Sequence, residues 1–184
     1  EWKRPKREQQ SVDPTIWEKD SIVWYSQEIT RKLGKQKFAE YVKEFEYGNA
    51  DVKGVPGHTD GLTESWLMSS LRISPDQQVD FMRRFVSGKI PASKQAYDNT
   101  KAIIPQFTAA DGWLIHGKTG SGRIRNKVGK ADGNNWLGWF VGWAEKGDQR
   151  VVFATLNVRE WTTKEPISFA TRDALIADLP KLVK

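Results

Sequence analysis

A change of hydrophobic pattern at Gly112 constrains the fold of this chain more than any other feature. Before Gly112, apolar residues recur at the three- and four-residue spacing of amphipathic helices. After it come three apolar runs of strand length, at residues 113–120, 136–144 and 150–158. Lys146-Gly147-Asp148 joins the last two runs as a hairpin turn, and residues 170–183 return to helical spacing. Helices that are segregated from antiparallel strands in this way predict an α+β fold.

Four helices are expected before Gly112, over residues 20–33, 38–45, 75–88 and 93–104. The third has the clearest signature, because Ser74 can cap it, Pro75 takes the first position and Gln77 completes a capping box. Asp20 is expected to cap the first helix. Residues 1–14, the glycine-containing stretch 51–63 and the basic stretch 121–135 are expected to be loops. Three strands are few for a core of this size, and a missing N-terminal part could supply more.

Composition excludes several classes of protein. The 184 residues suffice for a single domain, which we assign to residues 1–184. The sequence contains no cysteine, which excludes disulfides, cysteine nucleophiles and thiolate metal sites. Its two histidines, His58 and His116, are far apart, so no metal site is expected. No apolar run is long enough for a transmembrane helix.

Two basic runs, residues 3–7 and 123–130, raise the alternative of a nucleic-acid-binding module. The net charge of +6 favours anionic partners only weakly. The second run lacks interleaved aromatic residues that could stack on bases. We therefore interpret both runs as solvated loops and expect no nucleic-acid partner.

Lys118-Thr119-Gly120 is the first candidate for chemistry, because it places a cation beside a hydroxyl at the end of a strand. On its own the tripeptide is a weak signal. Ser21 could relay a proton, or it could help to cap a helix. Tyr47-Gly48-Asn49 could end a helix. Trp66 could be a core residue or an indole donor, and Arg172 could be a solvated charge or a carboxylate anchor.

The order and spacing of these motifs carry more information than any one of them. Ser21-Ile22-Val23, then Tyr47-Gly48-Asn49, Trp66, Lys118-Thr119-Gly120 and Trp139-Phe140-Val141-Gly142-Trp143 are similar to the motifs of class D serine beta-lactamases, the oxacillinases. The resemblance covers the chain from about Asp20 onward. It implies the penicillin-recognising fold of serine beta-lactamases and transpeptidases, in incomplete form. It also implies hydrolysis of beta-lactam antibiotics through a serine acyl-enzyme, and hence antibiotic resistance.

The same resemblance implies roles for individual residues. Ser21 would relay protons and Val23 would provide an apolar wall. Trp66 would donate its indole N–H to a lysine carbamate, and Lys118 would supply positive potential near Ser21. Thr119, Gly120 and Arg172 would bind the substrate, with Thr119 and Arg172 holding its carboxylate. The backbone N–H of Ser121 would form half of the oxyanion hole, and Tyr47 and Asn49 would shape the neighbouring loop.

One departure from the family pattern is serious. The nucleophilic serine and its partner lysine belong to an S-x-x-K motif, and none of the serines here has a lysine three positions later. The resemblance therefore implies that both lie on a missing N-terminal segment, which could also be a separate chain. The only cofactor expected is carbon dioxide, bound as the carbamate of that absent lysine. We expect the 184 residues alone to be inactive.

Other readings of the sequence stay open. A sensor domain that is acylated by beta-lactams without efficient turnover would have the same motifs, and a transpeptidase is a weaker alternative. Expected partners are beta-lactam antibiotics and the missing segment, with a homodimer left open. The family implies a periplasmic or secreted bacterial protein, although no signal sequence is visible.

Overall fold

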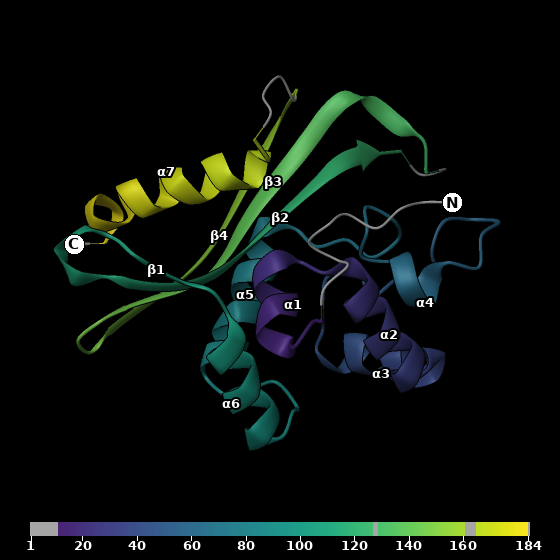
Figure 1. The fold of residues 1–184 in the computed structure, drawn as a ribbon, viewed down its shortest axis with the longest axis horizontal. Helices are drawn as coiled ribbons and strands as arrows, with labels where there is room; N and C mark the ends of the chain where they lie inside the picture. The colour runs from purple at the N-terminus through teal and green to yellow at the C-terminus, as the bar shows by residue number, and fades with distance from the viewer. Residues whose placement is uncertain (1–10, 127–128, 161–164, 184) are drawn as a thin grey trace.

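The computed structural model describes residues 11–126, 129–160 and 165–183, and it has the expected helix–sheet–helix order. A single antiparallel sheet runs in the order β1-β2-β3-β4 through the described part of the chain (Figure 1). Its strands are β1 (Gln106–Thr108), β2 (Leu114–Arg125), β3 (Ala131–Lys146) and β4 (Gln149–Glu160). α7 (Ile167–Leu182) covers one face, and the helices that precede the sheet lie on its other side (Figure 1). The α+β prediction is confirmed.

The helices before the sheet are α1 (Pro14–Asp20), α2 (Val23–Leu33), α3 (Lys35–Glu44), α4 (Gly61–Glu64), α5 (Pro75–Val86) and α6 (Lys94–Ile103). The capping box of α5 forms as predicted. The backbone N–H of Gln77 donates to Ser74 Oγ at 3.2 Å, and Ser74 N–H donates to Gln77 Oε1 at 3.0 Å. These two hydrogen bonds fix where α5 begins, and they therefore determine which of its side chains face the sheet.

The single helix expected over residues 20–33 is wrong, because the chain forms two helices there. Asp13 caps α1, with the N–H of Ile16 donating to Asp13 Oδ1 at 2.8 Å, and Asp20 is the last residue of α1. Ser21 then adopts the left-handed conformation, with φ 53° and ψ 56°. Ile22 is fully buried and anchors the link before α2 starts. Asp20 therefore does not cap α2, whose N-cap position is occupied by Ile22.

The loop expected over residues 121–135 is also wrong. β2 continues to Arg125 and β3 begins at Ala131, with Ser121 opposite Gly138 and Arg123 opposite Trp136. Pairing with the neighbouring strand outweighs the glycine and charge content of this segment, since each pair closes ladder hydrogen bonds. The sequence analysis also missed β1, which is only three residues long. The predicted loop over residues 1–14 lies mostly outside the described residues.

The two faces of the sheet form separate apolar cores. Ile115 and Phe140 are fully buried on the face that Leu179 of α7 covers. Trp143 packs on the opposite face, against Met82 of α5. Successive strand residues point to opposite faces, so a side chain on β2 belongs either to the α7 side or to the α5 side. This alternation decides which of the candidate residues can share a site.

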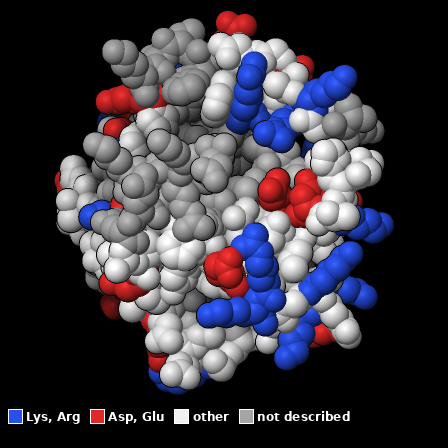
Figure 2. Space-filling view, turned by 45° about the vertical axis from the view of Figure 1, so that its right-hand side comes forward, with Lys and Arg blue, Asp and Glu red and all other residues white. Residues whose placement is uncertain are grey.

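The surface around α2 and α3 mixes charges of both signs. Figure 2 shows basic side chains with acidic ones among them on this side of the molecule. Arg31 pairs with Glu28 on α2, for example. Among the described residues there is no helix long and apolar enough to cross a membrane.

Candidate active site

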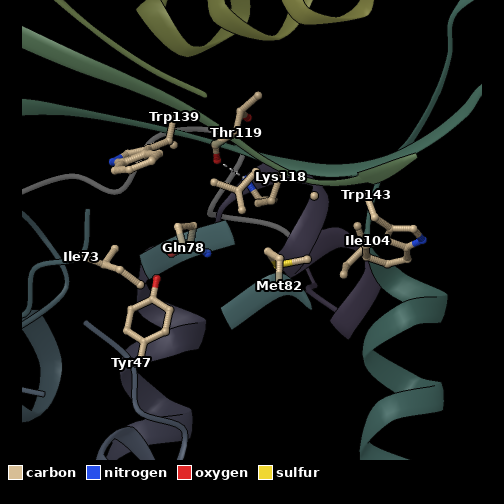
Figure 3. Close-up of a pocket in the computed structure, with 12 residues that line it drawn as sticks. Tyr47, Ile73, Gln78, Met82, Ile104, Lys118, Thr119, Trp139 and Trp143 are labelled. Carbon is tan, nitrogen blue, oxygen red and sulfur yellow. Dashed lines mark hydrogen bonds between the residues drawn. The ribbon is translucent and has the colours of Figure 1, made fainter. Parts of the chain in front are cut away.

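A pocket of about 290 Å³ opens between the sheet and α5 (Figure 3). Lys118 points into it from β2, on the face away from α7, and Trp139 and Trp143 line it from β3. Met82 of α5 and Tyr47 lie on the facing side. The pocket therefore combines one cationic group with a mostly aromatic and aliphatic wall, which suits a compact ligand that carries both an anionic group and an apolar body.

Lys118 and Ser21 are brought together although 97 positions separate them in the sequence. Lys118 Nζ donates to Ser21 Oγ at 2.5 Å and to the carbonyl oxygen of Thr119 at 2.8 Å. A lysine ammonium has three N–H donors and no acceptor, so it fixes Ser21 Oγ as a hydrogen-bond acceptor. The hydroxyl proton of Ser21 thus points to some other group.

The backbone around Ser21 is held by Trp17. Ile22 N–H donates to the carbonyl oxygen of Trp17 at 3.1 Å. The Trp17 indole N–H donates to Ser26 Oγ at 2.8 Å, and its ring stacks on Tyr25 at a centroid distance of 5.3 Å. These contacts lock α1 to α2 on either side of Ser21. A non-glycine residue in the left-handed region persists only where its surroundings determine it, and such residues concentrate at functional sites.

Glu18 is a charged residue near this pair that the sequence analysis missed. It lies three residues before Ser21, in the last turn of α1. Burial raises the pKa of the Glu18 carboxyl above its ordinary value, and the positive charge of Lys118 acts in the opposite direction. Its closeness to Ser21 in the sequence is the signal from which it could have been found.

Tyr47 and Asn49 lie on the loop that follows α3. Tyr47 lines the pocket and meets Phe81 edge-on at 4.9 Å. Burial raises the pKa of Tyr47, an effect that a hydrogen bond with Gln78 reduces. Asn49 ties its loop to a neighbouring one, because its Nδ2 donates to the carbonyl oxygen of Ser70 at 2.8 Å and its Oδ1 accepts from Arg72 N–H at 2.9 Å.

Gly48 between them is required by close approach. It has φ 55°, and a Cβ atom there would lie 2.0 Å from the carbonyl oxygen of Arg72. The Tyr47-Gly48-Asn49 segment therefore holds two loops together beside the pocket, which is more than the helix-ending turn that its residue types alone indicated.

Val23 and Trp66 are not among the residues that line the pocket. Val23 is half-buried at the start of α2. Trp66 is half-buried and packs edge-on against Phe38 of α3, with ring centroids 5.9 Å apart. The roles that the family resemblance implies for these two residues both concern a lysine outside this chain, so their placement here leaves those roles as proposals.

Thr119 and Gly120 follow Lys118 in the pocket wall. Ser121 instead turns its side chain toward α7, where its Oγ donates to Ser168 Oγ at 2.8 Å and accepts from Ser168 N–H at 3.3 Å. Ser168 is almost fully buried and was missed from the sequence. This pair fixes the start of α7 to β2 directly behind the Lys118-Thr119-Gly120 segment.

Arg172 does not share the pocket with Lys118, which corrects the sequence prediction. Its guanidinium lies over the rings of Phe107 and Phe169, at 5.3 Å and 4.9 Å from their centroids, and pairs with Asp173 at 2.7 Å. Phe107 packs on Phe140, which belongs to the α7 side of the sheet. Lys118 faces the α5 side. The rotation of α7 about its own axis is not encoded in the residues that precede the helix. In the structure this rotation places Arg172 on the α7 side of the sheet, away from the pocket.

His116 lies two residues before Lys118 on the same face of β2. Its ring stacks on Trp143 at 4.6 Å, with 2° between the ring planes. Burial lowers the pKa of His116, Glu145 raises it, and Arg150 and Lys101 lower it. Within the described ranges, no cluster of three or more potential metal ligands is present. The stack serves as an aromatic wall next to the lysine.

Comparison with known proteins agrees with this geometry. Residues 1–172 match the penicillin-binding protein transpeptidase domain. The structure superposes on that of OXA-427, a class D beta-lactamase, with a TM-score of 0.89 and 42% identity, over 96% of this chain and 72% of that chain. This chain belongs to the class D beta-lactamase family. The resemblance inferred from the motifs is thereby confirmed.

Two further relatives extend the comparison. The class D family member OXA-9 of Klebsiella pneumoniae is 49% identical over 177 residues, which are 96% of this chain and 65% of OXA-9. The C-terminal domain of the Bacillus licheniformis BlaR penicillin receptor has a TM-score of 0.79 and 26% identity, over 100% of this chain and 68% of that chain. The chain thus spans just under two thirds of the length of OXA-9.

Proposed function

We propose that this chain forms one wall of the active site of a beta-lactamase that opens the lactam ring through a serine acyl-enzyme. The observation that carries the proposal is the hydrogen bond from Lys118 to Ser21 at the pocket. It joins the Lys118-Thr119-Gly120 segment to the Ser21-Ile22-Val23 segment in a chain of the class D family. A positive charge and a hydroxyl then face the same space.

Within this proposal, Ser21 passes a proton. Because Ser21 Oγ accepts from Lys118 Nζ, its own O–H donates in another direction. When Ser21 gives this proton to the lactam nitrogen that leaves the carbonyl, Lys118 Nζ gives one of its protons to Ser21 Oγ in return. The ammonium of Lys118 also stabilises negative charge that develops as the lactam carbonyl is attacked. The cation, rather than a general base, is the part of the reaction that this residue supplies.

The pocket wall would position the antibiotic. We propose that Lys118, Thr119 and Gly120 face its carboxylate, while Trp139 and Met82 contact the apolar body. Arg172 has no part in this scheme, since it lies behind the sheet. The backbone N–H of Ser121 remains our proposal for one oxyanion-hole donor, and its side chain is held by Ser168.

The attacking serine and the lysine that carries a carbamate are proposed to lie on a segment outside these 184 residues, because no S-x-x-K motif occurs among them. When present, the carbamate supplies a general base. We propose that Val23 and Trp66 of this chain contact the carbamate. Export to the periplasm is proposed from the family alone.

The test of this function is Lys118→Ala in the complete protein. We expect acylation by a penicillin to fall by about two orders of magnitude or more, the loss typical of an active-site electrostatic group. The measurement is the rate of acyl-enzyme formation by mass spectrometry. Lys101→Ala, on α6 away from the pocket wall, is the matched control. An unchanged rate in Lys118→Ala would show that the Lys118-Thr119-Gly120 segment is only a structural turn.

A sensor is the second candidate, supported by the likeness to the BlaR penicillin receptor. The two functions differ in the fate of the acyl-enzyme. Incubation of the complete protein with excess penicillin distinguishes them, since a hydrolase releases many equivalents of product and a sensor stops after one.

A further inference from the structure

The backbone of β2 loses one of its two neighbouring strands before it reaches Ser121. β1 pairs with β2 only at residues 114–116. The N–H of Gly117 still donates on that side, to the carbonyl oxygen of Pro105 at 3.0 Å. Backbone N–H groups of alternate residues in a strand point to the same side. The N–H of Ser121, four residues after Gly117, therefore points to the edge of β2 that β1 leaves open.

This stretch of β2 is paired with β3 alone. Ser121 lies opposite Gly138 in that pairing, and the register shifts soon afterwards, between Arg123 and Arg125. A shift of this kind bends a strand and increases its local twist. The direction of the Ser121 N–H thus depends on a segment that has one neighbouring strand and an irregularity two residues further on.

The start of α7 supplies a second support at this point. Ser121 Oγ donates to Ser168 Oγ at 2.8 Å and accepts from the N–H of Ser168 at 3.3 Å. Ser168 is only 2% exposed. A Cβ atom at Gly138 would lie 2.6 Å from the backbone nitrogen of Ser168, so β2, β3 and α7 meet closely here. Two hydrogen bonds to a buried residue fix the side chain of Ser121, and through its Cβ they restrain the adjoining backbone.

We infer that Ser168 is a positioning residue for the backbone N–H of Ser121. It keeps this N–H aimed at the open edge of β2, where the proposed function places the oxyanion. The role in the reaction rests on that proposed function, whereas the hydrogen bonds between Ser168 and Ser121 do not depend on it. A donor in an oxyanion hole is effective because its direction is set before the charge develops. Ser168 acts through Ser121 and does not touch the substrate.

The first test is Ser168→Ala in the complete protein. We expect the first-order rate of acylation by a penicillin to fall about tenfold, which is less than the loss of roughly 10²- to 10³-fold on removal of an oxyanion donor. The dissociation constant of the non-covalent complex should stay unchanged, because the donor acts on charge that develops in the transition state. Stopped-flow acylation at a series of penicillin concentrations separates the two constants.

Infrared spectroscopy of the acyl-enzyme provides a readout that a general loss of stability would not move. A hydrogen bond to the ester carbonyl oxygen weakens the C=O bond and lowers its stretching frequency. We expect the carbonyl band in Ser168→Ala to lie at higher wavenumber than in the unchanged protein, because the Ser121 N–H is less well aligned. A band at the same wavenumber would overturn the inference.

Thr171 offers a matched control on the same helix. It is also 2% exposed, and its Oγ1 donates to the carbonyl oxygen of Ile167 at 3.0 Å, within α7. Thr171→Val removes a buried hydroxyl and keeps the shape of the side chain. We expect this variant to keep the acylation rate and the carbonyl band of the unchanged protein. Equal losses in Thr171→Val and Ser168→Ala would indicate general loosening of α7 and would overturn the inference.

A double-mutant cycle tests whether the two serines act as a unit. Ser121→Ala removes both hydrogen bonds to Ser168 but keeps the backbone N–H, so it should slow acylation at least as much as Ser168→Ala. The double variant should then be no slower than Ser121→Ala alone. Losses that multiply in the double variant would show that the two hydroxyls act separately, which contradicts a role of Ser168 through Ser121.

Hydrogen exchange in the 184-residue chain needs no antibiotic and separates this inference from the proposed function. The amides of Gly120 and Gly122 point toward β3, and we expect Ser168→Ala to speed their exchange about fivefold, the effect of losing one hydrogen bond. Faster exchange together with a complete protein that is never acylated would leave the positioning of Ser121 standing and remove the proposed function. Normal acylation of Ser168→Ala would leave the function standing and overturn the inference.

Discussion

Ser21 combines a strained backbone with a hydroxyl that Lys118 binds. Its φ of 53° lies in the left-handed region, where a side chain costs about 1–2 kcal/mol relative to the right-handed region. Glycine adopts this conformation without that cost. Serine at position 21 is therefore less favourable for folding than glycine would be, but it provides a hydroxyl at a fixed position.

This strain leads to a stability prediction. Ser21→Gly and Ser21→Ala both remove the hydroxyl, but only alanine keeps a Cβ atom in the left-handed region. We expect Ser21→Gly to be more stable than Ser21→Ala by about 1 kcal/mol in urea unfolding. Equal stabilities would show that the link between α1 and α2 relaxes when the hydroxyl is lost.

His116 gives a prediction for pH. Burial lowers its pKa in the folded state, so the folded protein favours the neutral ring and the unfolded chain binds the proton more readily. This contribution to stability is present above the ordinary histidine pKa of about 6.5 and is lost as pH falls through the lower folded value.

We expect unfolding free energy to fall with acidification below about pH 6.5, and this fall to be smaller in His116→Phe, which retains an aromatic ring against Trp143. Urea titrations at a series of pH values measure the slope. His58 is exposed, and His58→Gln is the control that should keep the slope of the unchanged protein.

Motif residues were easier to predict from sequence than their neighbours. Lys118 and Ser21 were identified because their segments resemble a family pattern, and the structure brings them together. Arg172 was misplaced because its position depends on how α7 is rotated against the sheet, which no local pattern specifies. Glu18 was missed because it lies on α1, a helix that the sequence analysis did not expect.

At the level of secondary structure, β3 depends on positions without side chains. A Cβ atom at Gly138 would lie 2.6 Å from the backbone nitrogen of Ser168 and 2.7 Å from the carbonyl carbon of Ile167. Both neighbours are backbone atoms at the start of α7, so they cannot move independently of the helix. Gly138 therefore sets how closely α7 approaches the sheet.

We expect Gly138→Ala to destabilise the protein by about 1–3 kcal/mol, the range of an overpacked core, and to speed amide exchange in the first turn of α7. Gly120→Ala is the matched control on β2, because its Cβ atom would meet Trp139 Cβ at an ordinary 3.9 Å. Thermal unfolding and hydrogen exchange check the pair. Similar losses for both variants would indicate a general cost of alanine in these strands.

Elements with strong local signals were predictable, and those set by pairing were not. The α5 helix has its own capping box, and its start was predicted to the residue. The segment 121–135 contains glycine and basic residues, and its strand structure comes from the register between β2 and β3. Cross-strand partners are distant in sequence, so a pattern of neighbouring residues does not show how they stabilise a strand.

At the scale of the whole molecule, the pocket is formed by α5, by the loop that carries Tyr47 and by the sheet, which are far apart in sequence. The antiparallel order and the C-terminal helix were predictable, whereas α1, which ends just before Ser21, was not.

We expect the purified 184-residue chain to release no hydrolysed nitrocefin, because its sequence contains no S-x-x-K motif. Absorbance over several hours measures the product, with the complete protein as the positive control. Steady release by the chain without another polypeptide would require a nucleophile among its own serines.

Trp139 and Trp143 have one more consequence, because both form part of the pocket wall around Lys118. Their indoles make the pocket visible to ultraviolet light. An occupant that displaces water from these rings should shift their fluorescence emission to shorter wavelength, and the spectral difference between the unchanged protein and Trp139→Phe isolates that signal from the background of the remaining tryptophans. Binding to this site can thus be followed in solution without any attached dye.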